Sequence, residues 1–175
     1  MKAPLVLLTA LFIASAHQNL SGETSGDWTY SVSDNQATIT GYSGAGGAVD
    51  IPAVVNDISV VKVGNGWPAI FGNGNTTVTS VTIPNGVTSI GEDAFFNCIS
   101  LDSVTIGNSV TSIGDTAFGY CTSLASITIP DSVTSIGEYV FLGCTSLASI
   151  TIPDSVTSMG NYAFESCTSL TSVTL

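Results

Sequence analysis

The chain has 175 residues, and its thirteen acidic side chains against two basic ones give a net charge of −11 at pH 7. Phosphate contacts need lysine and arginine, so this composition excludes nucleic acid as a partner and argues against an anionic membrane surface. The length alone is that of one ordinary domain.

The first sixteen residues have the pattern of a secretory signal peptide. Lys2 supplies a positive charge, residues 5–13 are almost wholly apolar, and residues 14–16 (ASA) fit a cleavage site. The apolar run is too short to span a bilayer, and no later stretch has the composition of a transmembrane segment. We therefore predict a secreted or cell-surface protein that is cleaved after Ala16, with a mobile linker over residues 17–27.

Residues 28–77 are predicted to form a β-rich N-terminal cap and a degenerate repeat with an inserted loop. Apolar and polar residues alternate over 28–32 and again over 37–41, as in half-buried strands. The extra residues of the degenerate repeat fall in the glycine- and asparagine-rich segment 64–75. Trp67 and Phe71 in this loop either cover the end of the core or contact a ligand.

Residues 78–175 contain four repeats of a 23-residue unit and the start of a fifth, without a C-terminal cap. The copies that begin at Ser123 and Ser146 are identical over their first thirteen positions. Repetition with a period of about 20–50 residues is typical of solenoids, in which each unit packs only on its neighbours. An uncapped last unit exposes a strand edge, so self-association through the C-terminal edge is an expected option.

Each unit is predicted to contain one strand, a corner, a short helical or 3₁₀ turn and a return. The glycines at 91, 114, 137 and 160 are expected to be left-handed, and Phe, Cys and Leu spaced three apart favour the helical turn. The strand reads Ser-Val-Thr-Ile or a close variant, and its alternation turns the apolar residues inward and the hydroxyls outward. The outward residues are Ser80, Thr82, Ser103, Thr105, Ser126, Thr128, Ser149, Thr151, Ser172 and Thr174.

The unit SVTIP-xx-VTSIG-xx-AF-xx-C-x-SL resembles the BspA-type leucine-rich repeat of bacterial and protist surface proteins. The resemblance implies a repeat solenoid, a leucine-rich-repeat right-handed superhelix with a parallel β-sheet on the concave face and short helical turns opposite. It also implies a secreted or surface protein whose repeats bind other proteins or mediate attachment. The resemblance transfers no catalytic residue. Gly107, in place of the strand-ending proline, departs from the motif.

No set of residues predicts catalysis, a cofactor or a metal site. The chain has one histidine, His17, and no arginine, so a Ser-His-Asp triad is not easily assembled. Glu92, Asp115 and Glu138 recur with the repeat and are interpreted as solvated turn acids. Stacked equivalent cysteines lie about 4.8 Å apart with parallel side chains, which fits free buried thiols better than disulfides or tetrahedral zinc. These cysteines are Cys98, Cys121, Cys144 and Cys167.

The sequence favours a non-catalytic, extracellular protein-binding or adhesion module. If any face binds, the outward Ser/Thr columns are the first candidate, and Trp67 with Phe71 is the second. Extracellular or host proteins are the expected partners, with glycans as an alternative. A structural spacer in a larger secreted protein is the main competing hypothesis, and an ice-binding threonine array is a remote one. The β-propensity and solubility of threonine and serine also explain the columns without any ligand.

Overall fold

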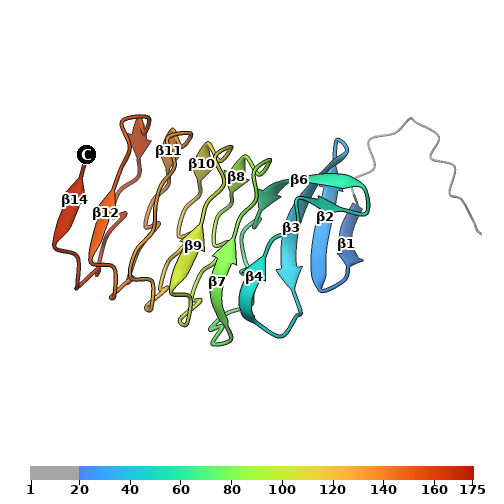
Figure 1. Cartoon of the computed structure of the whole chain (residues 1–175), viewed down its shortest axis with the longest axis horizontal. Helices are drawn as coiled ribbons and strands as arrows, with labels where there is room; N and C mark the ends of the chain where they lie inside the picture. Colours follow the sequence, from blue (N-terminus) through green and yellow to red (C-terminus); the bar gives the residue numbers. More distant parts are fainter. Residues whose placement is uncertain (1–19) are drawn as a thin grey trace, which may run out of the picture.

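The computed structural model describes residues 20–175, so the predicted signal peptide and its cleavage site lie outside the described residues. The chain forms a β-solenoid of about six turns with parallel sheets. The turns stack side by side along one long axis (Figure 1). We number the four regular coils 1 to 4, covering residues 78–100, 101–123, 124–146 and 147–169.

Three antiparallel strands precede the coils and form the β-rich cap that the sequence predicts. β1 (Leu20–Ser25) pairs with β2 (Trp28–Ser33), which pairs with β3 (Gln36–Tyr42). The structure differs from the predicted linker over 17–27, because residues 20–25 are ordered by backbone pairing with β2 although most of their side chains are exposed. Backbone pairing leaves no hydrophobic pattern in the sequence, which explains the difference.

One ladder of parallel strands runs through every coil, and we call it the continuous ladder. β3 pairs in parallel with β6 (Ile58–Val63), whose edge also carries β5 (Val54–Val55) in antiparallel register. Each regular coil then adds one two-residue strand in the same register. These strands are β8 (Ser89–Ile90), β10 (Ser112–Ile113), β11 (Ser135–Ile136) and β13 (Ser158–Met159).

The Ser-Val-Thr segments form a second ladder, which we call the interrupted ladder. β4 (Gly47–Asp50), β7 (Val78–Thr82) and β9 (Ser103–Thr105) make a three-stranded parallel sheet. β12 (Ser149–Thr151) and β14 (Ser172–Thr174) make a separate two-stranded sheet. Residues 126–129 of coil 3 lie between the two sheets, and in the described part of the chain no backbone hydrogen bond joins them to coil 2 or coil 4.

Inside the solenoid, equivalent side chains stack on one another from coil to coil. Phe95, Phe118 and Phe141 are fully buried, and Phe164 continues their column at the last coil. Consecutive ring centroids are 5.2, 5.6 and 5.6 Å apart, and the ring planes are within 9° of parallel. The core is therefore a set of identical columns, as repetition of the same apolar positions requires.

The predicted helical or 3₁₀ turns are wrong, because the described residues contain turns but no helix. The amides of Phe96 and Cys98 donate to carbonyls three residues back, as in a 3₁₀ turn. The amide between them, that of Asn97, instead donates to the Gly119 carbonyl of the next coil at 2.7 Å. Each turn segment therefore bonds both within itself and to its neighbour, and no continuous helix can form.

The glycine column beside the continuous ladder also has a different cause from the one expected. Gly91, Gly114, Gly137 and Gly160 are not left-handed, but each lies against the backbone of the preceding coil. A Cβ on Gly114 would lie 2.6 Å from the Glu92 amide nitrogen, which is closer than real Cβ atoms approach. Glycine is needed there for close packing of coils, and non-glycine residues such as Asp93 occupy the left-handed turn positions.

Candidate functional site

The predicted Ser/Thr columns lie on the interrupted ladder, in two separate groups. Ser80 and Thr82 are in register with the hydroxyls of β9, and β12 is in the same register with β14. Every residue of the columns is exposed except Ser80, which is half-buried. Ser126 and Thr128 are exposed but belong to no strand. The structure therefore brings the predicted residues together on either side of a break in coil 3.

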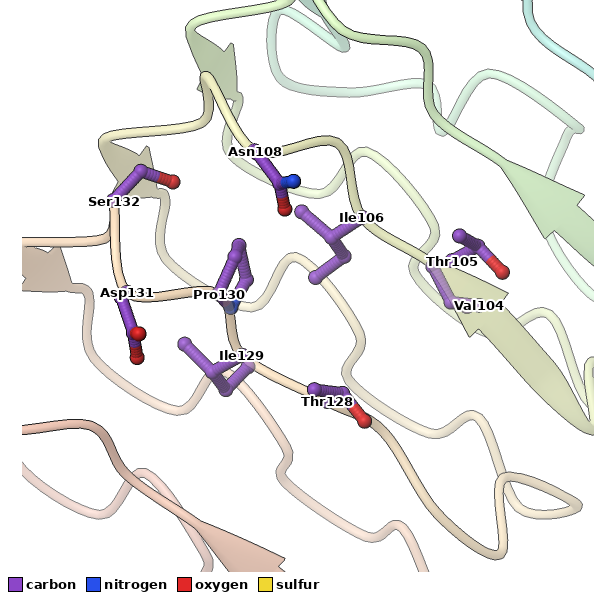
Figure 2. A pocket seen from close by; sticks show the side chains of 9 residues that line it. All are labelled: Val104, Thr105, Ile106, Asn108, Thr128, Ile129, Pro130, Asp131 and Ser132. Atoms are coloured by element: carbon purple, nitrogen blue, oxygen red, sulfur yellow. The ribbon is translucent and has the colours of Figure 1, made fainter.

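A cleft of about 710 Å³ lies at this break, between coil 2 and coil 3. Figure 2 shows Ile106 on one side, Ile129 and Pro130 on the other, and Thr105 and Thr128 from the hydroxyl columns. The lining is completed by Val104, Asn108, Asp131 and Ser132.

Gly107 lies between two residues that line the cleft, at a position where other regular repeats have proline. Without a side chain, Gly107 lies so close to Pro84 that a Cβ would be 2.6 Å from the proline carbonyl oxygen. The adjacent Asn108 amide donates to Asn85 Oδ1 at 2.9 Å. Coil 2 is thus bonded to coil 1 at this position. The cleft lies on the other side of coil 2, towards coil 3, where the Ser132 hydroxyl donates to the Val110 carbonyl at 2.7 Å.

The cleft combines polar and apolar groups. Its lining has hydroxyl, amide and aliphatic groups, with Asp131 as its one ionisable side chain. The backbone groups of 126–129 carry no coil-to-coil hydrogen bonds, so they can donate to or accept from a ligand.

Trp67 and Phe71, the second predicted pair, have separate positions. Phe71 is only 6% exposed and packs against Trp28, Tyr42 and Phe95, with ring centroids 6.4, 5.4 and 5.9 Å away. It covers the N-terminal end of the phenylalanine column and presents little surface to a ligand. Trp67 is 61% exposed and rests edge-on against Phe96. Of the two, Trp67 alone remains a candidate contact residue.

The four cysteines are free, three of them buried and Cys167 half-buried. Each thiol of the later three donates to the phenylalanine carbonyl of the preceding coil, at 3.2 Å for Cys121, 3.1 Å for Cys144 and 3.0 Å for Cys167. Burial raises the pKa of Cys98 and of Cys144 to about 12. The thiolate is the reactive form, so these thiols are inert packing groups at neutral pH.

Residues 20–175 hold no group of three or more histidine, cysteine, aspartate or glutamate side chains arranged to bind a metal ion. Nor does this part of the chain contain a helix with the length and apolar character needed to cross a membrane.

The cleft is the feature that sequence reasoning missed. The one sequence feature near the cleft that departs from the repeat is Gly107, which replaces proline. This substitution alone does not predict that the next coil lacks a strand. A second surface that the sequence did not predict lies along the glycine column of the continuous ladder.

Comparison with known proteins gives consistent matches. A family model described as the BspA type leucine rich repeat region (6 copies) matches residues 69–175. The crystal structure of the T. pallidum leucine rich repeat protein TpLRR is 32% identical with a TM-score of 0.79, over 86% of this chain and 70% of that one. A leucine-rich repeat protein from Bacteroides ovatus is 37% identical with a TM-score of 0.77, over 87% of this chain but only 41% of its own.

A third crystal structure adds a cellular location for a similar protein. It is a leucine rich cell surface protein from Faecalibacterium prausnitzii, 31% identical with a TM-score of 0.54, over 90% of this chain and 55% of that one. The search of curated proteins found no match. The chain thus spans well under two thirds of two of these three structures.

Proposed function

Because the chain belongs to the family of BspA-type leucine-rich repeat proteins, we propose that it is an extracellular protein-binding or adhesion module. The repeat family is generally non-catalytic, and we propose the same for this chain. The F. prausnitzii cell surface protein and the signal-peptide pattern of residues 1–16 support a secreted or surface location. Extracellular or host proteins are the proposed partners, with glycans as the alternative.

The observation that carries this proposal is the cleft within the Ser/Thr columns. Solenoids use their extended repeated surfaces for recognition. Here the regular columns supply exposed hydroxyls, and the break at 126–129 supplies a recess lined by aliphatic and polar side chains, with backbone groups that have no coil-to-coil hydrogen bonds. A ligand pocket commonly combines an apolar lining with a few polar groups that fix orientation.

The test is capture of partners by the full chain and by two variants of equal charge. Capture from a set of extracellular proteins and an array of glycans defines the ligand. The first variant replaces Ser126, Thr128, Ser149 and Thr151 with lysine, and should reduce capture at least tenfold. The matched control places four lysines away from the columns, at Thr145, Ser146, Thr168 and Ser169, which are all exposed.

The control should bind as the parent chain does. Undiminished capture by the first variant would show that the Ser/Thr columns are not the binding face. An equal loss in both variants would assign the effect to net charge and would also contradict the proposal.

A second candidate, a structural spacer, is favoured by the near-identity of coils 3 and 4. Their segments 123–135 and 146–158 are the same sequence, whereas a surface shaped for one ligand needs different residues at each coil. A spacer depends on the number of coils and not on their surface. Its function would survive the lysine substitutions, but it would change when 23 residues are deleted or added.

A further inference from the structure

The continuous ladder carries a shallow groove of about 460 Å³ that crosses five coils. We call it the glycine groove, because glycines form its floor at one position of each regular coil. Serine hydroxyls lie along one side, and the Ser112 hydroxyl donates to Ser89 Oγ at 3.1 Å. The floor glycines are Gly91, Gly114, Gly137 and Gly160.

The glycines of the groove have no room for a side chain of their own. On Gly160 a Cβ would lie 2.4 Å from the Glu138 amide nitrogen, and on Gly137 it would lie 2.6 Å from that of Asp115. Close packing of each coil on the preceding one therefore forces glycine at every step. Two charged side chains reach this floor, because a Cβ on Gly137 would lie within 3.0 Å of Asp115 Oδ1 and a Cβ on Gly91 would lie 3.0 Å from Lys62 Cε.

The other side of the groove is lined by one carboxylate from each of three successive coils, Glu92, Asp115 and Glu138, and all three are exposed. Asp115 Oδ1 accepts from the Glu138 amide at 2.7 Å, which fixes this side chain at the groove. Lys62, at the N-terminal end, is the one cation among residues 20–175, and its Nζ donates to Asn65 Oδ1 at 3.2 Å. Beyond Lys62 the groove is anionic.

A pair of tyrosines follows the last carboxylate of the column, next to the residues that line the groove but not among them. Tyr139 follows Glu138 directly, and its ring stacks on Tyr162 with centroids 5.1 Å apart and planes 12° from parallel. Tyr162 is 62% exposed. The pKa of Tyr139 is raised, first by desolvation and then by the negative charges of Glu165 and Glu138. Tyrosine faces beside carboxylates attract lysine and arginine through cation–π contacts and charge pairing together.

We propose that the glycine groove binds an extended peptide segment of a partner protein that carries lysine or arginine on alternate residues. The proposal rests on the proposed protein-binding function and names a partner chemistry for a different face. The anionic wall selects a cationic ligand, and the tyrosine pair holds one of its cations.

The spacing of the groove fits such a ligand. Successive coils are about 4.8 Å apart, so the three carboxylates span about 10 Å. An extended peptide places same-face side chains about 6.7 Å apart, so two cations fall within this span. The serine hydroxyls on the opposite side can bond the peptide backbone.

The experiment titrates the full chain with a labelled peptide of four Lys-Thr repeats and follows fluorescence anisotropy. A Glu-Thr peptide of the same length is the reference ligand. We expect binding of the lysine peptide only, weakened at least tenfold when the salt concentration rises from low to about 0.5 M, because salt screens exposed charge pairs.

Two triple variants with the same change in charge locate the site. The groove variant is Glu92→Gln, Asp115→Asn and Glu138→Gln, which keeps one acceptor oxygen and the shape of each side chain while removing its charge. It should weaken binding at least tenfold. The control variant is Asp57→Asn, Asp102→Asn and Asp154→Asn, at exposed positions that line neither the groove nor the cleft, and it should stay within twofold of the parent chain. An unchanged affinity in the groove variant, or an equal loss in both, overturns the proposal.

The outcome separates the groove from the Ser/Thr columns. Capture of extracellular partners without any affinity for the lysine peptide overturns the groove proposal alone. Binding of the lysine peptide that persists when lysines occupy the Ser/Thr columns supports the groove, whatever that variant does to the capture of other partners. Binding of a neutral oligosaccharide in the groove in preference to the lysine peptide also overturns the proposal.

Discussion

The two ladders of this solenoid come from the same 23-residue repeat, yet one is continuous and the other is broken. The continuous ladder has Ser-Ile-Gly or Ser-Met-Gly at every regular coil, and its glycines all lie against the preceding backbone. In the interrupted ladder, the residue after the Ser-Val-Thr-Ile segment is Pro84, Gly107, Pro130 or Pro153. One departure at Gly107 coincides with the lost strand of coil 3. The comparison shows that this repeat stays regular where contact with the backbone of the preceding coil admits only glycine.

The largest expected effect comes from ionising the buried cysteine column, which the two ladders share. An unfolded thiol ionises near the ordinary pKa of 9.0, whereas burial keeps Cys98 and Cys144 protonated to about 12. The contribution of these thiols to the free energy of unfolding is therefore fully present below pH 9. It is lost as the pH rises from 9 towards 12, by about 1.4 kcal/mol per pH unit for each such thiol.

Urea unfolding at pH 8, 9, 10 and 11 measures this loss. In the variant Cys144→Ala, the free energy of unfolding should fall less steeply as the pH rises. The difference in slope should be the contribution of one thiol, about 1.4 kcal/mol per pH unit. Hydrogen exchange at pH 10.5 should show both ladders opening together. A free energy of unfolding that is independent of pH would mean that the thiols are not buried.

The next test compares one position from each ladder. Gly114→Ala forces a methyl group against the Glu92 amide and should cost about 1–3 kcal/mol of stability, as overpacking does. Thr128→Val, at an exposed site on the interrupted ladder, should change stability by less than about 0.5 kcal/mol. Equal effects in urea unfolding would remove the distinction between the two ladders.

Hydrogen exchange gives the smallest effect and the most direct view of the break. The amide of Gly137 donates to the Ile113 carbonyl at 2.9 Å, whereas the amides of 126–129 have no coil-to-coil partner in the described chain. At neutral pH the latter should exchange at least about tenfold faster, because protection requires a bond that must open first. Equal protection across coil 3 would show that the interrupted ladder closes in solution.

Much of the architecture could be predicted from the repeat. The alternation of Ser-Val-Thr-Ile fixes which side chains are buried, and the fixed period places equivalent side chains in columns. The turn around Phe95 could not be predicted, since a spacing of three suits both a 3₁₀ helix and a stack of turns that bond to the next coil. Only the positions of the neighbouring coils decide between them.

The candidate surfaces were harder to predict, for a related reason. A glycine in sequence signals either a left-handed turn or a close approach, and the sequence does not separate the two. The groove along Gly114 and Gly137 depends on the second cause. In the same way, Trp67 and Phe71 have similar sequence surroundings, but only Phe71 reaches the end of the phenylalanine column.

The break at 126–129 also has a mechanical consequence. On the side of the continuous ladder, every coil is tied to the next by backbone hydrogen bonds, but on the other side coil 3 is tied to neither neighbour between 126 and 129. A pull along the long axis would therefore meet unequal resistance on the two sides. The solenoid would bend about the continuous ladder before it stretched, and coil 3 is where that hinge would lie.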